Sequence, residues 1–250
     1  MRVRGFTCGW LDSDLSMFIT GETGHLRVPV PAYVIEHAGQ VVVFDSGMHP
    51  DLRVDPAARI GRLAAAYVCD LPPGTALDER VAALDVAVDA VILSHLHFDH
   101  AGGCGLLPDA RLVVQRSEWD EAMAVNDGIV YNAVDFDCGH DRQLLDGEHD
   151  LFGDGRAVLI PTPGHTVGHQ SLRLRLDDGR EVILCGDSCY LRRALDDLAV
   201  PPFGHDVDQQ RATMLALRAL ESAGAQLVFG HDPDQWPVGA ADDRIVELSG

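Results

Sequence analysis

Three histidines and one aspartate lie within six residues, in the segment HLHFDH at positions 95–100. Neutral imidazoles and carboxylates are the side chains that bind borderline divalent metals such as zinc. In an extended segment alternate residues point to the same side, so His95 and His97 share one direction. The chain must then turn, which lets Asp99 and His100 face a second point close by. One short segment therefore offers two sets of ligands and predicts two adjacent metal ions.

Further potential ligands lie where other predicted strands end. They are His165 after residues 157–160, Asp187 after 181–185 and His231 after 226–229. Active sites of α/β sheets gather beyond the carboxyl ends of the strands, so these side chains are expected to meet the first segment. A histidine-rich surface loop is the alternative for the first segment, but it does not explain four segments at equivalent positions. Gly102 and Gly103 are expected to help the backbone turn after His100.

The elements that would position these residues form a mixed pattern. Strands are predicted at residues 32–37, 41–45, 89–94, 111–115, 157–160, 170–176, 181–185 and 226–229, and helices at 55–69, from Ser117 to about 125, and at 207–223. Turns at 38–40 and 177–180 connect hairpins, and Gly224 ends the last helix. Asp55-Pro56 and a capping box of Ser117 with Asp120 start the other two helices. This order predicts an α/β or α+β layered fold in one domain spanning residues 1–250.

The charge of the chain excludes several classes of function. Nineteen basic residues against 39 acidic ones give a net charge of −20, which disfavours binding to nucleic acids or anionic membranes. All the basic residues are arginine, so a lysine nucleophile, a lysine Schiff base and a P-loop lysine are excluded. No apolar run is long enough to span a membrane, and no signal peptide is recognised at the start. We therefore expect a cytoplasmic protein, whose six cysteines contain no CxxC pair.

The motif HLHFDHAGG, with the later PGH, GDS and GHD segments, resembles the metallo-β-lactamase superfamily over nearly the whole chain. The resemblance implies a four-layer αβ/βα sandwich with a dinuclear metal centre. It assigns His95, His97 and His165 to the first metal, Asp99, His100 and His231 to the second, and Asp187 to a bridging position. The metals are expected to be zinc, with iron, cobalt or manganese as alternatives, since the ligands accept all of them.

Within the superfamily the chain is most similar to the N-acyl-homoserine lactone lactonases. True β-lactamases lack a carboxylate bridge such as Asp187. The resemblance implies that water activated between the metals opens the lactone ring, that Tyr190 contacts the substrate carbonyl and that Asp99 delivers a proton. Alternatively, Tyr190 packs beneath a loop. Val167 departs from the family, where proline is common, and residues 126–150, where a substrate-shaping loop would lie, do not align.

Other functions on the same fold, and other residues, have separate interpretations. A glyoxalase II-like thioesterase, another ester or phosphodiester hydrolase, and a non-catalytic metal or ligand sensor are the alternatives, and a homodimer is a possible assembly. His169 is expected to support its loop, Asp45 to orient a histidine, and Cys104 to pack. Most of the remaining histidines are expected to be solvated or capping: His25, His37, His49, His140, His149 and His205.

Overall fold

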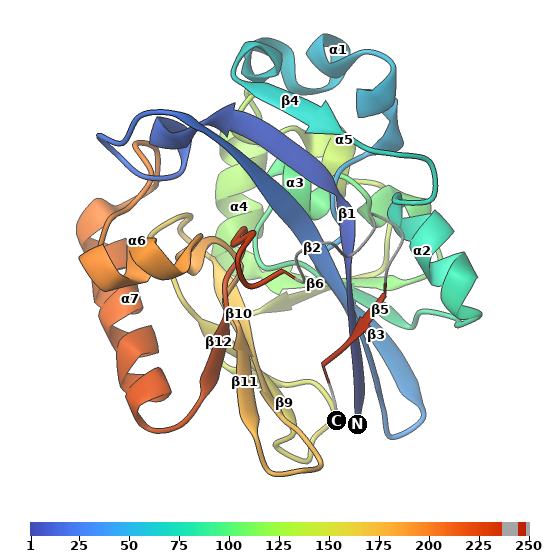
Figure 1. Ribbon diagram of the computed structural model, residues 1–250. Helices are drawn as coiled ribbons and strands as arrows, with labels where there is room; N and C mark the ends of the chain where they lie inside the picture. The colour runs from blue at the N-terminus through green and yellow to red at the C-terminus, as the bar shows by residue number, and fades with distance from the viewer. Residues whose placement is uncertain (237–244, 249–250) are drawn as a thin grey trace.

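Two β-sheets pack face to face in the computed structural model, which describes residues 1–236 and 245–248 (Figure 1). The larger sheet has the order β13 (Val246–Glu247), β1 (Arg2–Asp14), β2 (His25–His37), β3 (Gln40–Phe44), β5 (Ala90–Ile92), β6 (Arg111–Gln115) and β7 (Arg142–Leu145), with β4 (Tyr67–Asp70) also paired to β1. The smaller sheet has the order β12 (Gln226–Val228), β11 (Glu181–Leu184), β10 (Gln170–Arg175), β9 (Ala157–Pro161) and β8 (His149–Asp150).

Apolar side chains from both sheets form the central core. Ile35 and Phe44 of the larger sheet lie in one buried cluster with Leu172 and Leu184 of the smaller sheet. Alternate residues of a strand point to opposite faces, so the opposite face of each sheet needs a second apolar cover. Helices supply that cover.

The described residues contain seven α-helices, and several of them cover the outer faces of the two sheets. They are α1 (Pro56–Ile60), α2 (Leu77–Leu84), α3 (Phe98–Ala101), α4 (Arg116–Val125), α5 (Ala133–Phe136), α6 (Arg192–Asp197) and α7 (Val207–Ser222). Trp119 of α4 packs in a buried cluster with Leu112 of β6, and Leu217 of α7 packs with Leu227 of β12. Because α4 and α7 flank the pair of sheets, the layers are helix, sheet, sheet and helix, and the predicted four-layer sandwich is confirmed.

Several predicted elements are confirmed with small changes of boundary. The β2–β3 hairpin turns at Ala38 and Gly39, both of which have positive φ. Helix α7 starts at the predicted position, where the Asp206 side chain accepts hydrogen bonds from two backbone N–H groups. Gly224, with a φ of 111°, follows its end as expected. No helix in the described residues is both long and apolar enough to cross a membrane.

Two helix predictions are wrong in detail. The segment predicted as a helix over 55–69 contains α1, a 3₁₀ turn at Gly61–Ala65 and strand β4. Gly61 has a φ of 53°, which ends the helix, and the following strand adds to the edge of β1. Helix α4 begins at Arg116 rather than after a Ser117 cap, and Gln115 at its N-cap makes no side-chain hydrogen bond.

Candidate metal centre and active site

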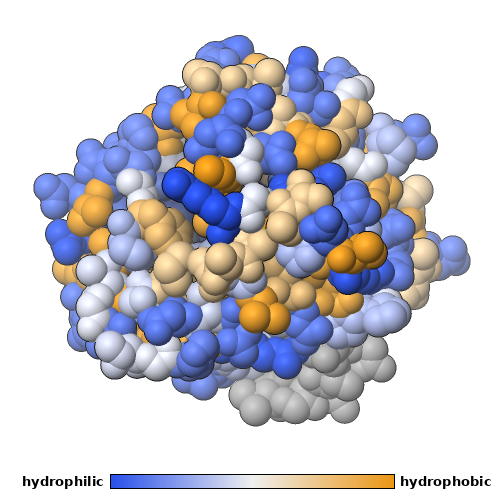
Figure 2. All heavy atoms as spheres, turned by 90° about the horizontal axis from the view of Figure 1, so that it is seen from above, coloured by the Kyte–Doolittle hydropathy of each residue, from blue (hydrophilic) through white to orange (hydrophobic). Residues whose placement is uncertain are grey.

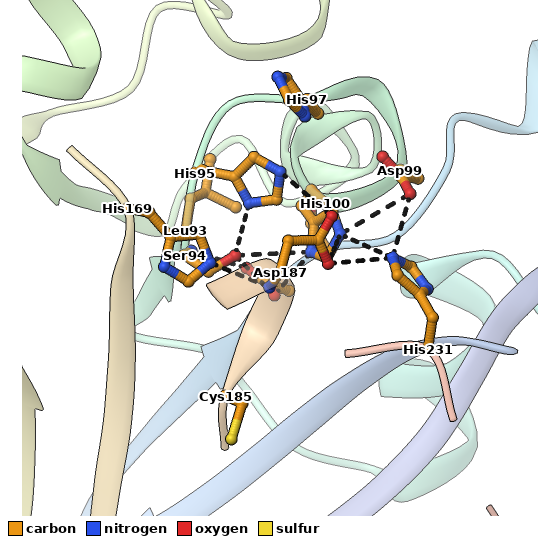
Figure 3. A network of polar contacts seen from close by, with 12 residues as sticks. Leu93, Ser94, His95, His97, Asp99, His100, His169, Cys185, Asp187 and His231 are labelled. Carbon is orange, nitrogen blue, oxygen red and sulfur yellow. Dashed lines mark hydrogen bonds and ion pairs between the residues drawn. The ribbon is translucent and has the colours of Figure 1, made fainter. Parts of the chain in front are cut away.

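The predicted ligands meet at one edge of the sandwich because the strands that carry them share a direction. Strands β11 and β12 are parallel, and β9 and β11 each run antiparallel to β10, so the three end at the same edge. His165, Asp187 and His231 follow these ends. Strand β5 of the larger sheet leads to His95 and to α3 at the same place. Figure 3 shows His95, Asp99, His100, Asp187 and His231 turned toward one another.

The ligand atoms fall into two groups, each lying within 4.8 Å: His95, His97, His165 and Asp187, and Asp99, His100 and His231. In the first group, His165 Nε2 lies 3.1 Å from His97 Nδ1. Asp187 Oδ2 lies 3.4 Å from His165 Nε2 and 3.7 Å from His95 Nε2. His95, His165 and Asp187 are buried, and His97 is partly buried.

The second group has a similar spacing. His100 Nε2 lies 3.3 Å from His231 Nε2, and Asp99 Oδ2 lies 3.5 Å from His231 Nε2 and 3.7 Å from His100 Nε2. Asp187 Oδ1 lies 3.0 Å from His231 Nε2 and 3.2 Å from His100 Nε2. Asp187 thus directs one oxygen to each group, which is the geometry of a bridging carboxylate.

The hydrogen bonds behind two of these histidines indicate a cation at the second group. His231 Nδ1 lies 2.8 Å from the Pro29 carbonyl oxygen, and His100 Nδ1 lies 2.9 Å from Asp45 Oδ2. Both acceptors require a proton on Nδ1, so in the neutral rings two Nε2 lone pairs face each other. Such a contact is repulsive unless a positive charge, either a proton on one ring or a metal ion, lies between the rings. The donor set therefore fits divalent metal ions.

The first ligand group also fits a metal ion, because one of its buried nitrogen atoms has no hydrogen-bond partner. His95 Nε2 is buried and has no hydrogen-bond partner, whereas its Nδ1 lies 3.0 Å from Ser94 Oγ. A buried nitrogen without a partner costs free energy that a bound cation would recover. Burial lowers the pKa of His95 and His165, and lowers that of His97 to about 4. These rings are therefore neutral near pH 7, the form that binds metals.

Charge in the second group is distributed differently. Burial alone would lower the pKa of His100 and that of His231. The Asp187 and Asp99 carboxylates outweigh burial and raise both pKa values. Burial raises the pKa of the Asp187 carboxyl, but the two histidines outweigh burial and hold it well below its usual value. Asp187 is therefore an anion at the centre of the cluster.

Residues behind the ligands confirm two expectations. Asp45 accepts the Ser94 backbone N–H at 2.7 Å and the Ser94 hydroxyl at 3.0 Å while it holds His100. His169 accepts the Asp187 backbone N–H at 3.0 Å through Nε2, and its Nδ1 lies 2.9 Å from Thr162 Oγ1. Asp45 thus orients a histidine, and His169 holds the loop that carries Asp187.

The two glycines after His100 serve close packing rather than an unusual turn. Gly102 and Gly103 have φ values of −58° and −88°, which any residue adopts. A Cβ at Gly102 would lie 2.8 Å from the His49 backbone nitrogen, and one at Gly103 would lie 2.1 Å from the Ser46 carbonyl oxygen. The expectation that they help the turn is therefore wrong. Glycine is needed at both positions because a Cβ would clash with neighbouring backbone atoms.

Tyr190 lies between the two ligand groups. Its ring centroid is 5.5 Å from that of His165 and 5.3 Å from that of His231, and its side chain is buried. Burial and the Asp187 carboxylate raise the pKa of Tyr190 well above its ordinary value. The side chain therefore stays a neutral phenol, which can donate its O–H.

A cavity of about 500 Å³ opens above the cluster, and its walls are mainly apolar. Phe18, Leu63, Tyr67, Phe98, Ile129 and Tyr131 are among the side chains that line it. Val130 and Phe203 lie at its rim and are partly exposed. Figure 2 looks onto the side of α1 and β4, where hydrophobic residues surround a strongly hydrophilic one near the middle of the face. The floor of the cavity includes Asp187, Tyr190 and His231.

Sequence reasoning did not identify most of these wall residues. Phe18, Tyr67 and Tyr131 come from distant segments, and nothing in their local sequence marks them as neighbours. The unaligned region 126–150 does contribute Ile129, Val130 and Tyr131 to the wall, but its later part forms β7 and β8. Cys104 is buried and donates to the Asp135 carbonyl oxygen at 3.0 Å, so it packs as expected.

The other histidines contribute no side-chain atom to either ligand group in the described residues. His25 is exposed, and His205 is an exposed residue at the cavity. His49 caps a 3₁₀ turn by accepting the Asp51 N–H at 3.1 Å. The remaining contacts are His37 with Asp154, His149 with Gln143, and His140 with the Leu107 carbonyl oxygen. His140 is the buried exception among the six that were expected to be mostly solvated or capping.

Comparison with known proteins agrees with this geometry. Residues 26–231 match the metallo-β-lactamase superfamily model. N-acyl homoserine lactonase AttM of Rhizobium radiobacter is 35% identical over 227 residues, covering 86% of each chain. N-acyl homoserine lactonase of Bacillus thuringiensis is 28% identical, covering 84% of each.

Solved structures show the same fold. An N-acyl homoserine lactone hydrolase with N-hexanoyl-L-homoserine bound at its metal centre matches with a TM-score of 0.86, at 23% identity and 98% coverage of both chains. AidC, a dizinc quorum-quenching lactonase, matches with a TM-score of 0.72 at 14% identity, covering 99% of this chain and 94% of its own. The chain therefore belongs to the metallo-β-lactamase superfamily, in the branch that contains the N-acyl homoserine lactonases.

Proposed function

We propose that this protein is a dinuclear metal-dependent hydrolase that opens the ring of N-acyl homoserine lactones. The observation that carries the proposal is an apolar cavity of about 500 Å³ whose floor is the His/Asp cluster and Tyr190. A polar ring that must meet the cluster, attached to an apolar acyl chain, matches a cavity of this composition. The similarity to AttM supports the same substrate class.

The proposed metal ligands are His95, His97 and His165 for one ion and Asp99, His100 and His231 for the other, with Asp187 between them. Zinc is the metal we propose, because His and Asp ligands in a buried site suit it. When bound, the ions would supply Lewis acidity and lower the pKa of water, so that a nucleophile is available near neutral pH. Hydrolysis of such lactones would quench quorum sensing.

The protein's own groups would orient the substrate and move protons. Tyr190 would donate its O–H to the lactone carbonyl oxygen, where negative charge develops during attack. Asp99 contacts both histidines of its group through Oδ2, so Oδ1 remains to carry a proton to the ring oxygen as it leaves. Phe18 and Ile129 would contact the acyl chain and exclude water.

A substrate panel tests this function. The metal-loaded protein is assayed with homoserine lactones of short and long acyl chains, a glutathione thioester and a phosphodiester. We expect lactone opening with the highest kcat/KM. Preferential turnover of the thioester or the phosphodiester would overturn the lactonase assignment, and no turnover of any substrate would favour a metal or ligand sensor.

The six cysteines support a cytoplasmic location as part of this proposal. All are free thiols, and four are buried. Reducing compartments keep thiols in this state, whereas secreted proteins commonly pair them.

We expect two metal ions per chain. Seven donors are divided into two groups joined by Asp187, and each group has a place for one cation. Elemental analysis of protein purified without chelator, or supplemented with zinc, should give a ratio near two. A reproducible ratio near one after supplementation would contradict the dinuclear assignment.

Replacing Tyr190 with phenylalanine should lower kcat and kcat/KM together by about tenfold, or about 1.4 kcal/mol. An oxyanion donor alone is typically worth about 10²–10³ in rate, but the proposed metals would share the charge. The ring and its contacts with His165 and His231 are kept, so metal content should not change. An effect on KM alone would mean that Tyr190 binds substrate without aiding the reaction.

A further inference from the structure

Glu118 is a fully buried carboxylate in the first turn of α4. Burying a carboxylate is costly unless hydrogen bonds compensate for the lost water. Its polar partners in the described structure are hydrogen-bond donors, and none of them is a basic side chain. Because burial of the Glu118 carboxylate costs free energy, its presence at this position requires a structural or functional explanation.

The two oxygens of Glu118 join segments that are far apart in the sequence. Oε1 accepts the Leu96 backbone N–H at 3.1 Å, and Oε2 accepts the Gly168 backbone N–H at 3.0 Å. Leu96 lies between His95 and His97, and Gly168 lies three residues after His165. One carboxylate therefore holds the loop after β5 of the larger sheet to the loop after β9 of the smaller sheet.

Close packing at Gly168 supports the same arrangement. A Cβ on Gly168 would lie 2.3 Å from the backbone nitrogen of Glu118 and 2.6 Å from its Cβ. Only glycine allows the loop to approach α4 closely enough for the hydrogen bond to Oε2. The second glycine of the PGHTVGH segment thus has a physical role in placing His165.

A third donor connects Glu118 to the cavity wall. The Tyr131 hydroxyl donates to Oε1 at 3.1 Å, and the Tyr131 ring lies 5.4 Å from the ring of His97. Tyr131 also lines the cavity. The same carboxylate therefore contacts both ligand loops and one substrate-facing side chain.

The second ligand group is supported by other residues. His100 is held by Asp45, and His231 is held by the Pro29 carbonyl oxygen. Neither contact involves Glu118. A change at Glu118 should therefore affect the two ligand groups unequally, which a general loss of stability would not do.

We propose that Glu118 is a positioning residue that fixes the His95, His97 and His165 group by clamping the loops after β5 and β9, and so sets the affinity of that group for its metal ion. The inference rests on the proposed dinuclear centre. It adds a residue that touches neither the ligand atoms nor the substrate, and that acts through Leu96, Gly168 and Tyr131.

Replacing Glu118 with glutamine tests the inference. The amide NH₂ cannot accept a hydrogen bond, so one set of N–H or O–H donors loses its partner. In a Co²⁺ titration of the metal-free protein, followed by the visible absorption of the bound ion, we expect one equivalent to bind about tenfold or more weaker. The other equivalent should bind as in the unmodified protein. If both equivalents bound to the variant as tightly as to the unmodified protein, or if both lost affinity equally, the inference would be overturned.

Glu79→Gln is the matched control. Glu79 also accepts two backbone N–H groups, those of Gly74 and Ala76, but it lies at the start of α2 away from the ligands. This control should bind both Co²⁺ equivalents unchanged. A selective loss of one equivalent in the control would show that the assay does not report on the clamp.

Tyr131→Phe is the second test of the Glu118 proposal and is used if Glu118→Gln does not fold. It removes one donor to Oε1 but keeps the ring and the two backbone donors, so the same Co²⁺ equivalent should weaken by roughly two- to fivefold, a smaller loss than that expected for Glu118→Gln. Unchanged binding of both equivalents would then overturn the inference. If the unmodified protein binds two Co²⁺ ions but opens no lactone, the proposed substrate fails while the clamp remains testable.

Discussion

Replacing Asp187 with alanine should lower kcat/KM by at least about 10³-fold, which corresponds to about 4 kcal/mol. Asp187 places one oxygen 3.0 Å from His231 Nε2 and the other 3.4 Å from His165 Nε2, so it is the side chain that contacts both groups. Its removal would leave two adjacent cations without their shared negative charge. Metal content should fall, and the stabilisation that bound metal adds to the folded state should fall with it. Steady-state kinetics, elemental analysis and thermal unfolding with and without zinc measure these effects.

Asp187→Asn separates the charge from the volume of the side chain. The amide fills the same space and keeps one acceptor oxygen. It should therefore still fit beside Gly230, where an added Cβ would lie 2.8 Å from Asp187 Oδ1. We expect most of the loss of activity to remain, because the missing charge is the main defect. Normal turnover with two bound metals in either variant would show that Asp187 does not bridge the ions.

The position of the candidate site was predictable because its signals are local. His95, His97, Asp99 and His100 are close in sequence, and the other ligands each follow an apolar run that predicts a strand. Parallel strands bring their carboxyl ends to one edge, so the convergence follows from the pattern. The start of α7 at Val207 was predicted from its amphipathic pattern, whereas the Asp206 cap was identified only in the structure.

Other features depend on contacts that no local pattern records. The segment after Pro56 has helix-forming residues, yet Tyr67–Asp70 becomes β4 because the edge of β1 offers backbone partners. Glu118 occupies a position that sequence reasoning assigned only to the start of a helix. Its burial and its bonds to Leu96 and Gly168 depend on how α4 packs against two loops.

The pair Gly102-Gly103 illustrates the same limit. From sequence, two glycines after a histidine cluster suggest a flexible turn, but their φ values are ordinary. What requires glycine is the approach of the loop after β3. The Ser46 N–H and hydroxyl both donate to the His100 carbonyl oxygen at 2.7 Å, and the Gly103 N–H donates to the Gly47 carbonyl oxygen at 3.0 Å. The loop and α3 are therefore in direct backbone contact.

Replacing Gly103 with alanine should lower the free energy of unfolding by about 3 kcal/mol, at the upper end of the range for overpacking. The new Cβ would lie 2.1 Å from the Ser46 carbonyl oxygen, and a backbone atom cannot rotate away as a side chain can. The loop and α3 must separate, which displaces His100 and weakens the second ligand group. Chemical denaturation of the metal-free protein measures the stability, and zinc content after dialysis measures the ligand group.

Gly105→Ala is the control for this prediction. It adds the same methyl group two residues further on, where the nearest atom is Cys138 Sγ at 2.9 Å. That sulfur is the end of a side chain and can rotate, so we expect a loss below about 1 kcal/mol and unchanged zinc content. If Gly103→Ala proved as stable as this control and kept both metals, the loop after β3 would not need its close approach to α3. The support that Ser46 gives to His100 would then be dispensable.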